Sequence, residues 1–416
     1  MRSALEQKYG IEMPVGYESY HPLRFMNFQM NRFCHEGYLR REDMETAAPK
    51  ITDLGSWQRE FTRIGEEAEK EGRILNAAFA YRAAEFFTYS TDPHKRWLSE
   101  RFITLFYEYF GEEDIERHKV PYEGSFLHAL RLVPAGPVKG TIVLHGGGDS
   151  FVEEFISFVG LFPDAGYEVV MFDGPGQGTS LHQYGHKMTH EWERPTAAVL
   201  DYFGLDDVTL IGISLGGYLA PRAAAFEPRI ARVVAFDIIG DFLGAFLKAM
   251  KPPVSIMFRA LLALRARGLF NRMLYKASRK PGVWGQFFEW WLLQTYYMWE
   301  VKTPYETFER MKDYNALTIS PRITQDALLL AGKNDVYTPY FDEQVKALSN
   351  ARSVEGRIFT EEEHAAEHCQ VGNCKLALEY ILDWIERRSP QATGTPTMQS
   401  DLQRDLQSDL QTQRAR

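Results

Sequence analysis

The sequence predicts an α/β fold, in which a mostly parallel central sheet is flanked by helices, preceded by a helical domain and interrupted by a helical insertion. Three observations lead to this prediction. Short Val/Ile/Leu runs alternate with helical stretches from residue 126 onward. One of these runs ends in the turn Gly212-Ile213-Ser214-Leu215-Gly216 and continues into an alanine-rich helical stretch. Residues 238–325 separate two later strand runs, far more than a crossover requires.

The first part of the chain predicts a helical domain. Trp57, Phe61 and Ile64 recur at three- and four-residue steps, which is the spacing of one helix face. A further helical stretch begins after Pro93 and ends at Gly111, as expected from residues that start and stop helices. We therefore expect residues 1–113 to form an N-terminal helical domain.

Strand-like runs characterise the next part of the chain. They are short and apolar, as is typical of central parallel strands, and they cover residues 126–133, 140–144, 168–172, 208–213, 232–236, 326–330 and 357–360. We expect one domain over residues 114–388. Its insertion, at about 240–318, is rich in Trp, Phe and Tyr and predicts a helical cap over the sheet, although ordinary core packing would use the same side chains. Residues 389–416 predict a disordered tail, because they carry too little apolar bulk to bury.

Composition and charge narrow the classes of function. The formal net charge of −9 is spread along 416 residues, which argues against nucleic-acid binding. The three cysteines lack metal-ligand spacing and fit a reducing compartment better than a disulfide framework. Neither a signal peptide nor a membrane span is recognisable. We therefore expect a cytoplasmic protein that binds neither nucleic acid nor membranes.

Ser214 is the candidate nucleophile. The turn between a strand and a helix holds such a serine in a strained conformation at its tip, where the hydroxyl is accessible. Glycine is expected at positions 212 and 216 because any side chain there would collide with the neighbouring strand or helix. Short Gly/Ser patterns also arise by chance, so the position between strand and helix is what makes this one informative.

A serine hydroxyl needs a histidine to take its proton and an acid to orient that histidine. Asp335 directly follows a strand run and is the candidate acid, with Asp237 at the end of the preceding strand run as the alternative. The loop after the last strand run holds two candidate bases, His364 and His368. Spacing alone does not separate the two histidines.

The glycine-rich loop after residues 140–144 predicts an oxyanion hole. Gly147 and Gly148 let the backbone approach a substrate, and an amide there would act together with the amide of Leu215, which follows the nucleophile. A phosphate-binding loop is disfavoured because this one lacks a Walker lysine and the Gly-x-Gly-x-x-Gly pattern.

We expect no metal and no cofactor. His182, His186 and His190 have a spacing that could serve a metal on a helix face. The surrounding Gly and Pro residues predict a loop instead, so the three histidines are interpreted as a chance cluster.

Several segments occur together and in order: Tyr81-Arg82-Ala83-Ala84, His145 to Asp149 followed by Glu153-Glu154, Phe172 to Gly178, the serine turn, and Glu367-His368-Cys369-Gln370. In this combination the chain resembles, over about residues 55–387, a branch of the α/β-hydrolases. That branch is related to 2,6-dihydroxypseudooxynicotine hydrolase and to fungal hydrolases of heptaketide and fusarin-type pathways. The resemblance implies the α/β-hydrolase fold, with residues 114–388 as its catalytic domain.

The resemblance also assigns roles. It implies that His368, which precedes Cys-Gln, is the base of a triad with Ser214 and Asp335, and that Asp149 helps to hold the substrate. The implied activity is hydrolysis of a carbon–carbon bond next to a ketone, or of an ester, in an aromatic or polyketide-type small molecule of secondary metabolism. Alternatives are an acyltransferase, a cyclase or a general carboxylesterase with the same triad, and then a noncatalytic binding protein. The family often forms homodimers, so a homodimer is a further expectation.

Overall fold

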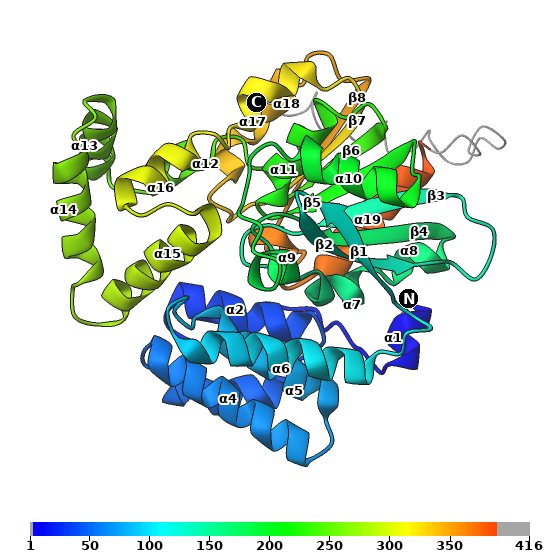
Figure 1. Cartoon of the computed structure of the whole chain (residues 1–416), viewed down its shortest axis with the longest axis horizontal. Helices are drawn as coiled ribbons and strands as arrows, with labels where there is room; N and C mark the ends of the chain where they lie inside the picture. Colours follow the sequence, from blue (N-terminus) through cyan, green and yellow to red (C-terminus); the bar gives the residue numbers. More distant parts are fainter. Residues whose placement is uncertain (1–2, 389–416) are drawn as a thin grey trace, which may run out of the picture.

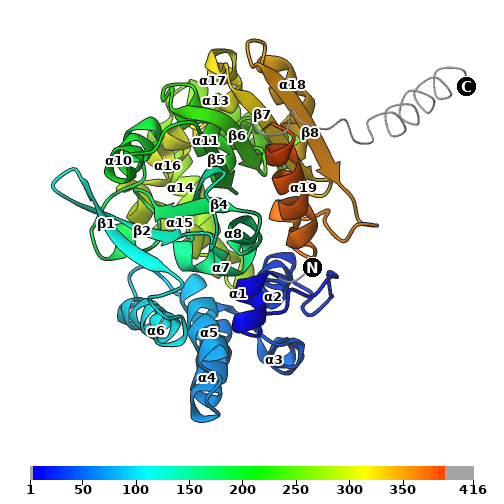
Figure 2. The same cartoon turned by 90° about the vertical axis from the view of Figure 1, so that its right-hand side faces the viewer.

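The structure is a computed structural model of the whole chain, and it describes residues 3–388. The predicted tail, residues 389–416, lies outside the described residues. Figure 1 shows a twisted central sheet, a group of N-terminal helices below it and the helices of the insertion to one side. The view turned by 90° in Figure 2 again places the N-terminal helices below the sheet.

The central sheet has eight strands in the order β1-β2-β4-β3-β5-β6-β7-β8. The six strands from β3 to β8 are parallel to one another. The strands are β1 (Glu116–Tyr122), β2 (Ser125–Leu132), β3 (Gly140–His145), β4 (Tyr167–Asp173), β5 (Val208–Ile213), β6 (Ile230–Phe236), β7 (Asp326–Gly332) and β8 (Ser353–Phe359). The carboxyl ends of the parallel strands therefore meet at one edge of the sheet, where ligands bind in open α/β sheets.

One predicted strand has the opposite direction to that expected. Residues 126–133 were expected to form a central parallel strand, but β2 is antiparallel to both β1 and β4 and lies second from the edge. β1 and β2 form a hairpin whose two turn residues, Glu123 and Gly124, have φ values of 43° and 79°. Such a tight turn joins antiparallel strands only, because parallel strands need a long crossover.

The N-terminal helices precede the first strand. They are α1 (Ala4–Lys8), α2 (Arg24–His35), α3 (Arg41–Ala47), α4 (Leu54–Lys70), α5 (Ile74–Phe86) and α6 (Pro93–Tyr109). The side chain of Asp53 caps α4 by accepting a hydrogen bond from the amide of Ser56, and Pro93 occupies the first position of α6. These local signals fix where the helices begin.

Helices cover both faces of the sheet. They are α7 (Ile156–Val159), α8 (Leu161–Asp164), α9 (Gly178–His182), α10 (Glu193–Phe203), α11 (Gly216–Ala224), α18 (Phe341–Ala347) and α19 (Cys374–Glu386). Successive side chains of β3 lie on opposite faces of the sheet. Ile142 and Leu144 pack in the core that continues into the N-terminal helices, and Val143 packs in the core around α11. The N-terminal helices thus share a core with one face of the sheet.

The long insertion after β6 is helical. It consists of α12 (Phe242–Lys248), α13 (Pro252–Ala263), α14 (Arg267–Ser278), α15 (Val283–Trp299), α16 (Pro304–Met311) and α17 (Ala316–Ile319). α15 packs on the N-terminal helices: Phe287 stacks on Phe25 with ring centroids 4.2 Å apart, and the indole of Trp290 donates to the carbonyl oxygen of Phe86. Within residues 3–388, no helix has the length and hydropathy needed to span a bilayer.

Candidate active site

Ser214 occupies a strained turn between β5 and α11. Its φ of 61° is in the left-handed region, which non-glycine residues rarely adopt. A Cβ on Gly212 would lie 2.1 Å from the carbonyl oxygen of Gly216, so only glycine fits there. At Gly217 a Cβ would lie only 1.6 Å from the carbonyl oxygen of Asp237. A Cβ on Gly216 would lie 3.0 Å from the carbonyl oxygen of Gly146, so the collision expected at that position is weaker than predicted.

Three of the predicted residues form one hydrogen-bonded chain. Nε2 of His368 lies 2.8 Å from Oγ of Ser214, and Nδ1 of the same ring lies 2.5 Å from Oδ2 of Asp335. β5, β7 and the loop after β8 deliver these side chains to the carboxyl edge of the sheet. The other candidate base, His364, is exposed at the surface.

The electrostatic surroundings of His368 favour a protonated ring. Burial by itself lowers the pKa of this imidazole, but the neighbouring Asp335 carboxylate more than offsets that effect and raises the pKa well above its ordinary value. The Asp335 side chain is almost completely buried, with 2% exposed, so water screens this attraction little. The ring is therefore well placed to hold a proton taken from Ser214.

Asp237, the alternative acid, has a different set of contacts. Its carboxylate accepts hydrogen bonds from the amides of Gly332 and Cys369 and from the side chain of Gln370. Burial raises the pKa of Asp237 to about 7. Asp335, not Asp237, is the hydrogen-bond partner of His368, and Asp237 holds the backbone that follows this histidine.

One group within residues 3–388 has the composition of a metal site. Ligand atoms of Asp237, Asp335 and His368 all lie within 4.8 Å of one another. Both carboxylates already accept hydrogen bonds, and the histidine already contacts Ser214.

The histidines interpreted as a chance cluster do not point to one centre. His182 ends the short helix α9, within a segment that was expected to be a loop. Each of the three lies against a different aromatic ring: His182 against Phe151, His186 against Tyr122 and His190 against Tyr314.

The glycine-rich loop after β3 lies directly beside the nucleophile. A Cβ on Gly147 would lie 2.6 Å from the amide nitrogen of Leu215 and 2.8 Å from Cβ of Ser214. Leu215 precedes the first turn of α11, where amides have no intrahelical acceptor. Gly148, with Met298 of α15 nearby, follows on the same loop. The glycine-rich loop and the start of α11 therefore lie side by side at Ser214.

Asp149 is held by the insertion and by an N-terminal helix. Its carboxylate accepts a hydrogen bond from the side chain of Gln294 on α15, and its carbonyl oxygen accepts one from Arg82 on α5. Burial raises the pKa of this carboxyl group. Asp149 was expected to hold the substrate, but it is not among the residues that line the cavity beside Ser214.

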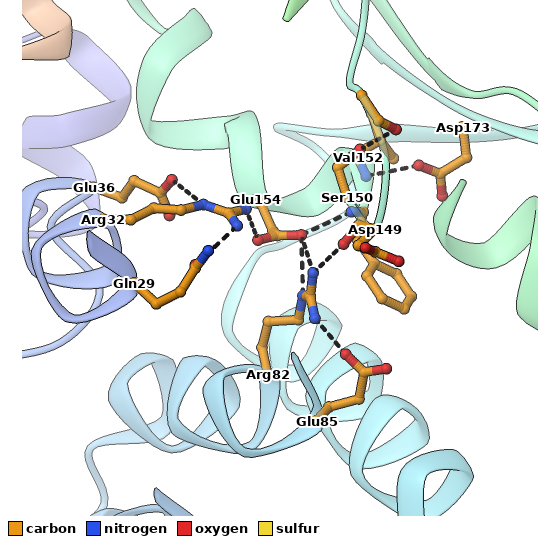
Figure 3. Close-up of polar contacts among 12 residues, drawn as sticks. Gln29, Arg32, Glu36, Arg82, Glu85, Asp149, Ser150, Val152, Glu154 and Asp173 are labelled. Atoms are coloured by element: carbon orange, nitrogen blue, oxygen red, sulfur yellow. Dashed lines mark hydrogen bonds and ion pairs between the residues drawn. The ribbon is translucent and has the colours of Figure 1, made fainter. Parts of the chain in front are cut away.

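A buried charge network connects the N-terminal helices to this loop (Figure 3). Glu154, which is fully buried, accepts hydrogen bonds from Arg32 of α2 and from Arg82 of α5. Arg82 also donates to Glu85 and to the carbonyl oxygen of Asp149. Charges buried in this way are retained only when they are paired, so the loop and both helices are mutually dependent.

A cavity of about 150 Å³ opens beside Ser214. Its walls come from the nucleophile turn, the glycine-rich loop, helices α2, α5, α7 and α19, the residues that follow α2 and precede α7, and the loop after β8. They are Phe28, Gln29, Arg32, Glu36, Phe86, Gly147, Gly148, Ser150, Phe155, Phe158, Ile213, Ser214, His368, Cys369, Val371 and Cys374. No residue of the insertion, which was expected to form a helical cap over the sheet, is in this set. The N-terminal helices supply part of the wall beside Ser214, and α15 of the insertion reaches the glycine-rich loop through Gln294 and Met298. A larger surface hollow, of about 630 Å³, lies at α6 and does not include Ser214.

The contribution of α2 was missed by sequence reasoning. Arg32 and Glu36 are four residues apart and form an ion pair along one side of the chain at the end of α2. The same spacing on an exposed helix is an ordinary surface pair, so the only available signal was the apolar character of the residues around it.

Comparison with known proteins gives one family match. A family model described as the alpha/beta hydrolase family matches residues 141–369, more than half of the chain. Hydrolase acrC of Aspergillus aculeatus is 26% identical over 348 residues, which cover 71% of this chain and 79% of that protein. The 20-hydroxy-prefusarin hydrolase FUS2 of Gibberella moniliformis is 32% identical over 254 residues, which cover 51% of this chain and 60% of FUS2. Hydrolase ORFZ of Pyricularia oryzae is 30% identical over 222 residues, which cover 45% of this chain and 52% of ORFZ. The chain therefore spans little more than half the length of ORFZ.

Two solved structures resemble the whole architecture. The 2,6-dihydroxy-pseudo-oxynicotine hydrolase has a TM-score of 0.61 and 20% identity, covering 88% of this chain and 98% of that one. AbyA5 has a TM-score of 0.62 and 17% identity, covering 84% and 90%. At these identities the likeness shows a common fold.

Proposed function

This chain belongs to the alpha/beta hydrolase family, and from that premise we propose that it is a serine hydrolase with Ser214 as nucleophile, His368 as base and Asp335 as the orienting acid. The family and the fold predicted from its motifs are confirmed. The observation that carries the proposal is the hydrogen-bonded chain from Asp335 through His368 to Ser214, at the carboxyl edge of the parallel strands.

The first half of the reaction forms an acyl-enzyme. Ser214 Oγ attacks the carbonyl carbon of the substrate while its proton passes to Nε2 of His368. The amide of Leu215 and an amide of the glycine-rich loop at Gly147 and Gly148 stabilise the resulting alkoxide, and each such donor typically contributes about 3 to 4 kcal/mol in the transition state. When the alkoxide collapses, the bond to the leaving group breaks and His368 gives its proton to the leaving atom.

The second half releases the acyl group. His368 takes a proton from water, the hydroxide attacks the ester on Ser214, and the serine leaves with the proton returned by His368. The net reaction adds one water across the broken bond. The leaving atom is oxygen in an ester. It is carbon in a ketone substrate, provided that a second carbonyl group accepts the electron pair of the broken bond as an enolate.

An aromatic or polyketide-type small molecule of secondary metabolism is the proposed substrate class. The relative FUS2 is named for hydrolysis of a prefusarin, and the structural neighbour is named for hydrolysis of an oxynicotine. The cavity supports an apolar group at the reacting carbonyl, because Phe28, Phe86, Phe155 and Phe158 line it.

Turnover by the Ser214→Ala variant tests the proposal. We expect the wild-type protein to hydrolyse members of a panel of aryl esters and aryl 1,3-diketones, and Ser214→Ala to lose at least about a thousandfold in kcat. The affinity of the variant for the same esters and diketones, measured by calorimetry, should equal that of the wild-type protein, because the substitution leaves the rest of the cavity unchanged. Turnover that survives in Ser214→Ala would show that the nucleophile is assigned wrongly.

Acyl transfer uses the same acyl-enzyme, and the fate of the acyl group distinguishes it from hydrolysis. In water enriched in heavy oxygen, the hydrolase produces a carboxylic acid that carries the label. An ester or amide product formed with an added alcohol or amine, at the expense of the acid, would assign the enzyme to acyl transfer.

A further inference from the structure

The insertion carries a local excess of positive charge. Residues 242–288 contain nine Lys and Arg residues and no Asp or Glu, in a chain whose formal net charge is −9. Within residues 3–388, one of these nine side chains has a carboxylate partner, since Nζ of Lys248 lies 3.9 Å from Oε1 of Glu343. The other eight are exposed and form no ion pair in that part of the chain: Lys251, Arg259, Arg265, Arg267, Arg272, Lys276, Arg279 and Lys280. A cluster of cations that is not neutralised attracts an anionic partner.

Helix α13 is apolar on both of its sides and carries one charged side chain. Phe258 and Leu262 are buried on the inner side. Ile256, Ala260 and Leu264 recur at steps of four on the outer side, where Ile256 is 67% exposed and Leu264 is 78% exposed. A helix that is apolar on all sides is normally covered on all sides. The outer side of α13 is therefore expected to have a partner.

The inner sides of α13 and α14 hold the two helices together as a helical hairpin. The ring of Phe258 on α13 packs edge-on against Phe270 on α14, with ring centroids 5.3 Å apart, and both rings contact Phe308 of α16. The exposed side chains of α13 are thus not those that fix the hairpin in place. Figure 1 shows α13 and α14 at the margin of the molecule, away from the sheet and from the N-terminal helices. This position leaves the hairpin accessible to a large surface.

Exposed apolar and basic side chains lie next to each other along the hairpin. In the turn, Leu264 is followed by Arg265 and Arg267, and on α14 Leu269 and Arg272 are three residues apart, which places them on one face. Helices that lie in the surface of a bilayer combine these two kinds of side chain. The apolar ones enter the boundary of the acyl chains, and the Lys and Arg side chains meet anionic headgroups.

Other partners fit the hairpin less well. A second copy that docked through the same face would bring two sets of cations together, and residues 242–288 offer no carboxylate to pair with them. A nucleic acid would pair with the cations, but its phosphates and sugars give little cover to the apolar side of α13. An anionic lipid surface is complementary to both the charge and the apolar side chains.

We propose that the α13–α14 hairpin docks the protein on an anionic lipid surface, with the outer side of α13 in the boundary of the acyl chains. A helix docked in this way lies in the plane of the interface and does not cross the bilayer. The expectation that the protein binds no membrane was based on the charge of the whole chain and on the lack of a span, and neither describes a local surface. The inference is independent of the roles proposed for Ser214, Asp335 and His368.

Co-sedimentation of the full chain with lipid vesicles tests the inference. One set of vesicles is phosphatidylcholine alone, and in the other set about one third of the lipid is phosphatidylserine. We expect binding to the anionic vesicles to be at least about tenfold tighter than binding to phosphatidylcholine. Salt at about 0.5 M should weaken binding to the anionic vesicles, because it screens the attraction between cations and headgroups.

Two double variants separate the apolar contribution from the charged one. Ile256→Gln/Leu264→Gln should bind the anionic vesicles at least about tenfold less tightly, because burial of both side chains is lost. Arg265→Gln/Arg267→Gln should lower the preference for anionic over phosphatidylcholine vesicles about tenfold. The matched control is Val133→Gln/Val138→Gln, which replaces two exposed valines outside the hairpin and should bind as the wild-type protein does.

Equal binding to both kinds of vesicle, or unchanged binding of Ile256→Gln/Leu264→Gln, would overturn the inference. Tight binding to duplex DNA without binding to vesicles would also overturn it and would assign the hairpin to nucleic acid. A dimer in analytical ultracentrifugation that Ile256→Gln/Leu264→Gln abolishes, without vesicle binding by the wild-type protein, would assign the hairpin to a second copy instead. All the substituted side chains are exposed, so circular dichroism should show folded variants, and labelling of Ser214 by a fluorophosphonate reports on the proposed function separately.

Discussion

The substitution Arg82→Met removes the centre of the buried charge network that holds the glycine-rich loop after β3 (Figure 3). Arg82 is 1% exposed, and its guanidinium donates to Glu154, to Glu85 and to the carbonyl oxygen of Asp149. Methionine keeps apolar bulk in this position but has no donor. We therefore expect a less stable protein with a lower kcat and a KM that changes less.

The structure sets the size of both effects. Breaking a buried ion pair typically costs about 3 to 5 kcal/mol of unfolding free energy. The lower end, about 3 kcal/mol, applies here because each carboxylate keeps another cation: Glu85 keeps Lys95 at 2.6 Å, and Glu154 keeps Arg32. Loosening the loop forfeits part of one oxyanion donor, so kcat should fall about tenfold, less than the hundredfold or more for complete loss.

Urea unfolding followed by tryptophan fluorescence, together with steady-state ester hydrolysis, measures these quantities. Arg96→Met on α6 is the matched control, because Arg96 is 85% exposed and pairs with the exposed Glu100. Loss of such a surface pair should cost no more than about 0.5 kcal/mol. A loss below about 1 kcal/mol in Arg82→Met would refute the argument from buried charge. If the folded variant keeps the wild-type kcat, the link between Arg82 and the proposed oxyanion donors of the glycine-rich loop is refuted.

Two further predictions concern the site itself. Burial lowers the pKa of His368, but Asp335 raises it well above its ordinary value; since the base must be neutral, kcat/KM should fall as the pH drops through this raised pKa. In Asp335→Asn the midpoint of that fall should move to lower pH, and an unmoved midpoint would separate the carboxylate from the histidine. Gly147→Ala should lower kcat at least about a hundredfold, because its Cβ would lie 2.6 Å from the amide nitrogen of Leu215. Gly136→Ala, with nothing within 4 Å of its Cβ, should behave as wild type, and equal rates in both variants would contradict the close approach of loop and turn.

Much of the fold could be predicted because buried parallel strands have a distinctive composition. β5 begins and ends at the residues expected for it, Val208 and Ile213, and β3 extends one residue beyond the predicted run. β1 was missed because its sequence is polar and contains Pro121, and it is half exposed at the edge of the sheet. The direction of β2 was wrong because an apolar run shows burial and carries no information about direction.

The proximity of Ser214, Asp335 and His368 could be expected because each follows a strand of one parallel sheet. The presence of Arg32 and Glu36 in the wall of the same cavity could not be expected. Arg32 and Glu36 lie far from the sheet in the sequence, and only tertiary packing of the N-terminal helices brings them to the cavity. The aromatic insertion was the more conspicuous feature, yet its rings pack largely against one another and on the N-terminal helices.

The central claim is that Ser214 is a nucleophile activated by His368 and Asp335. Labelling of the intact protein with a fluorophosphonate probe, followed by peptide mapping, tests this claim most directly. We expect modification at Ser214 that is lost in His368→Ala and strongly reduced in Asp335→Ala but retained in His364→Ala, whose imidazole is exposed at the surface. Absence of labelling in the folded wild-type protein, or undiminished labelling in His368→Ala, would contradict it.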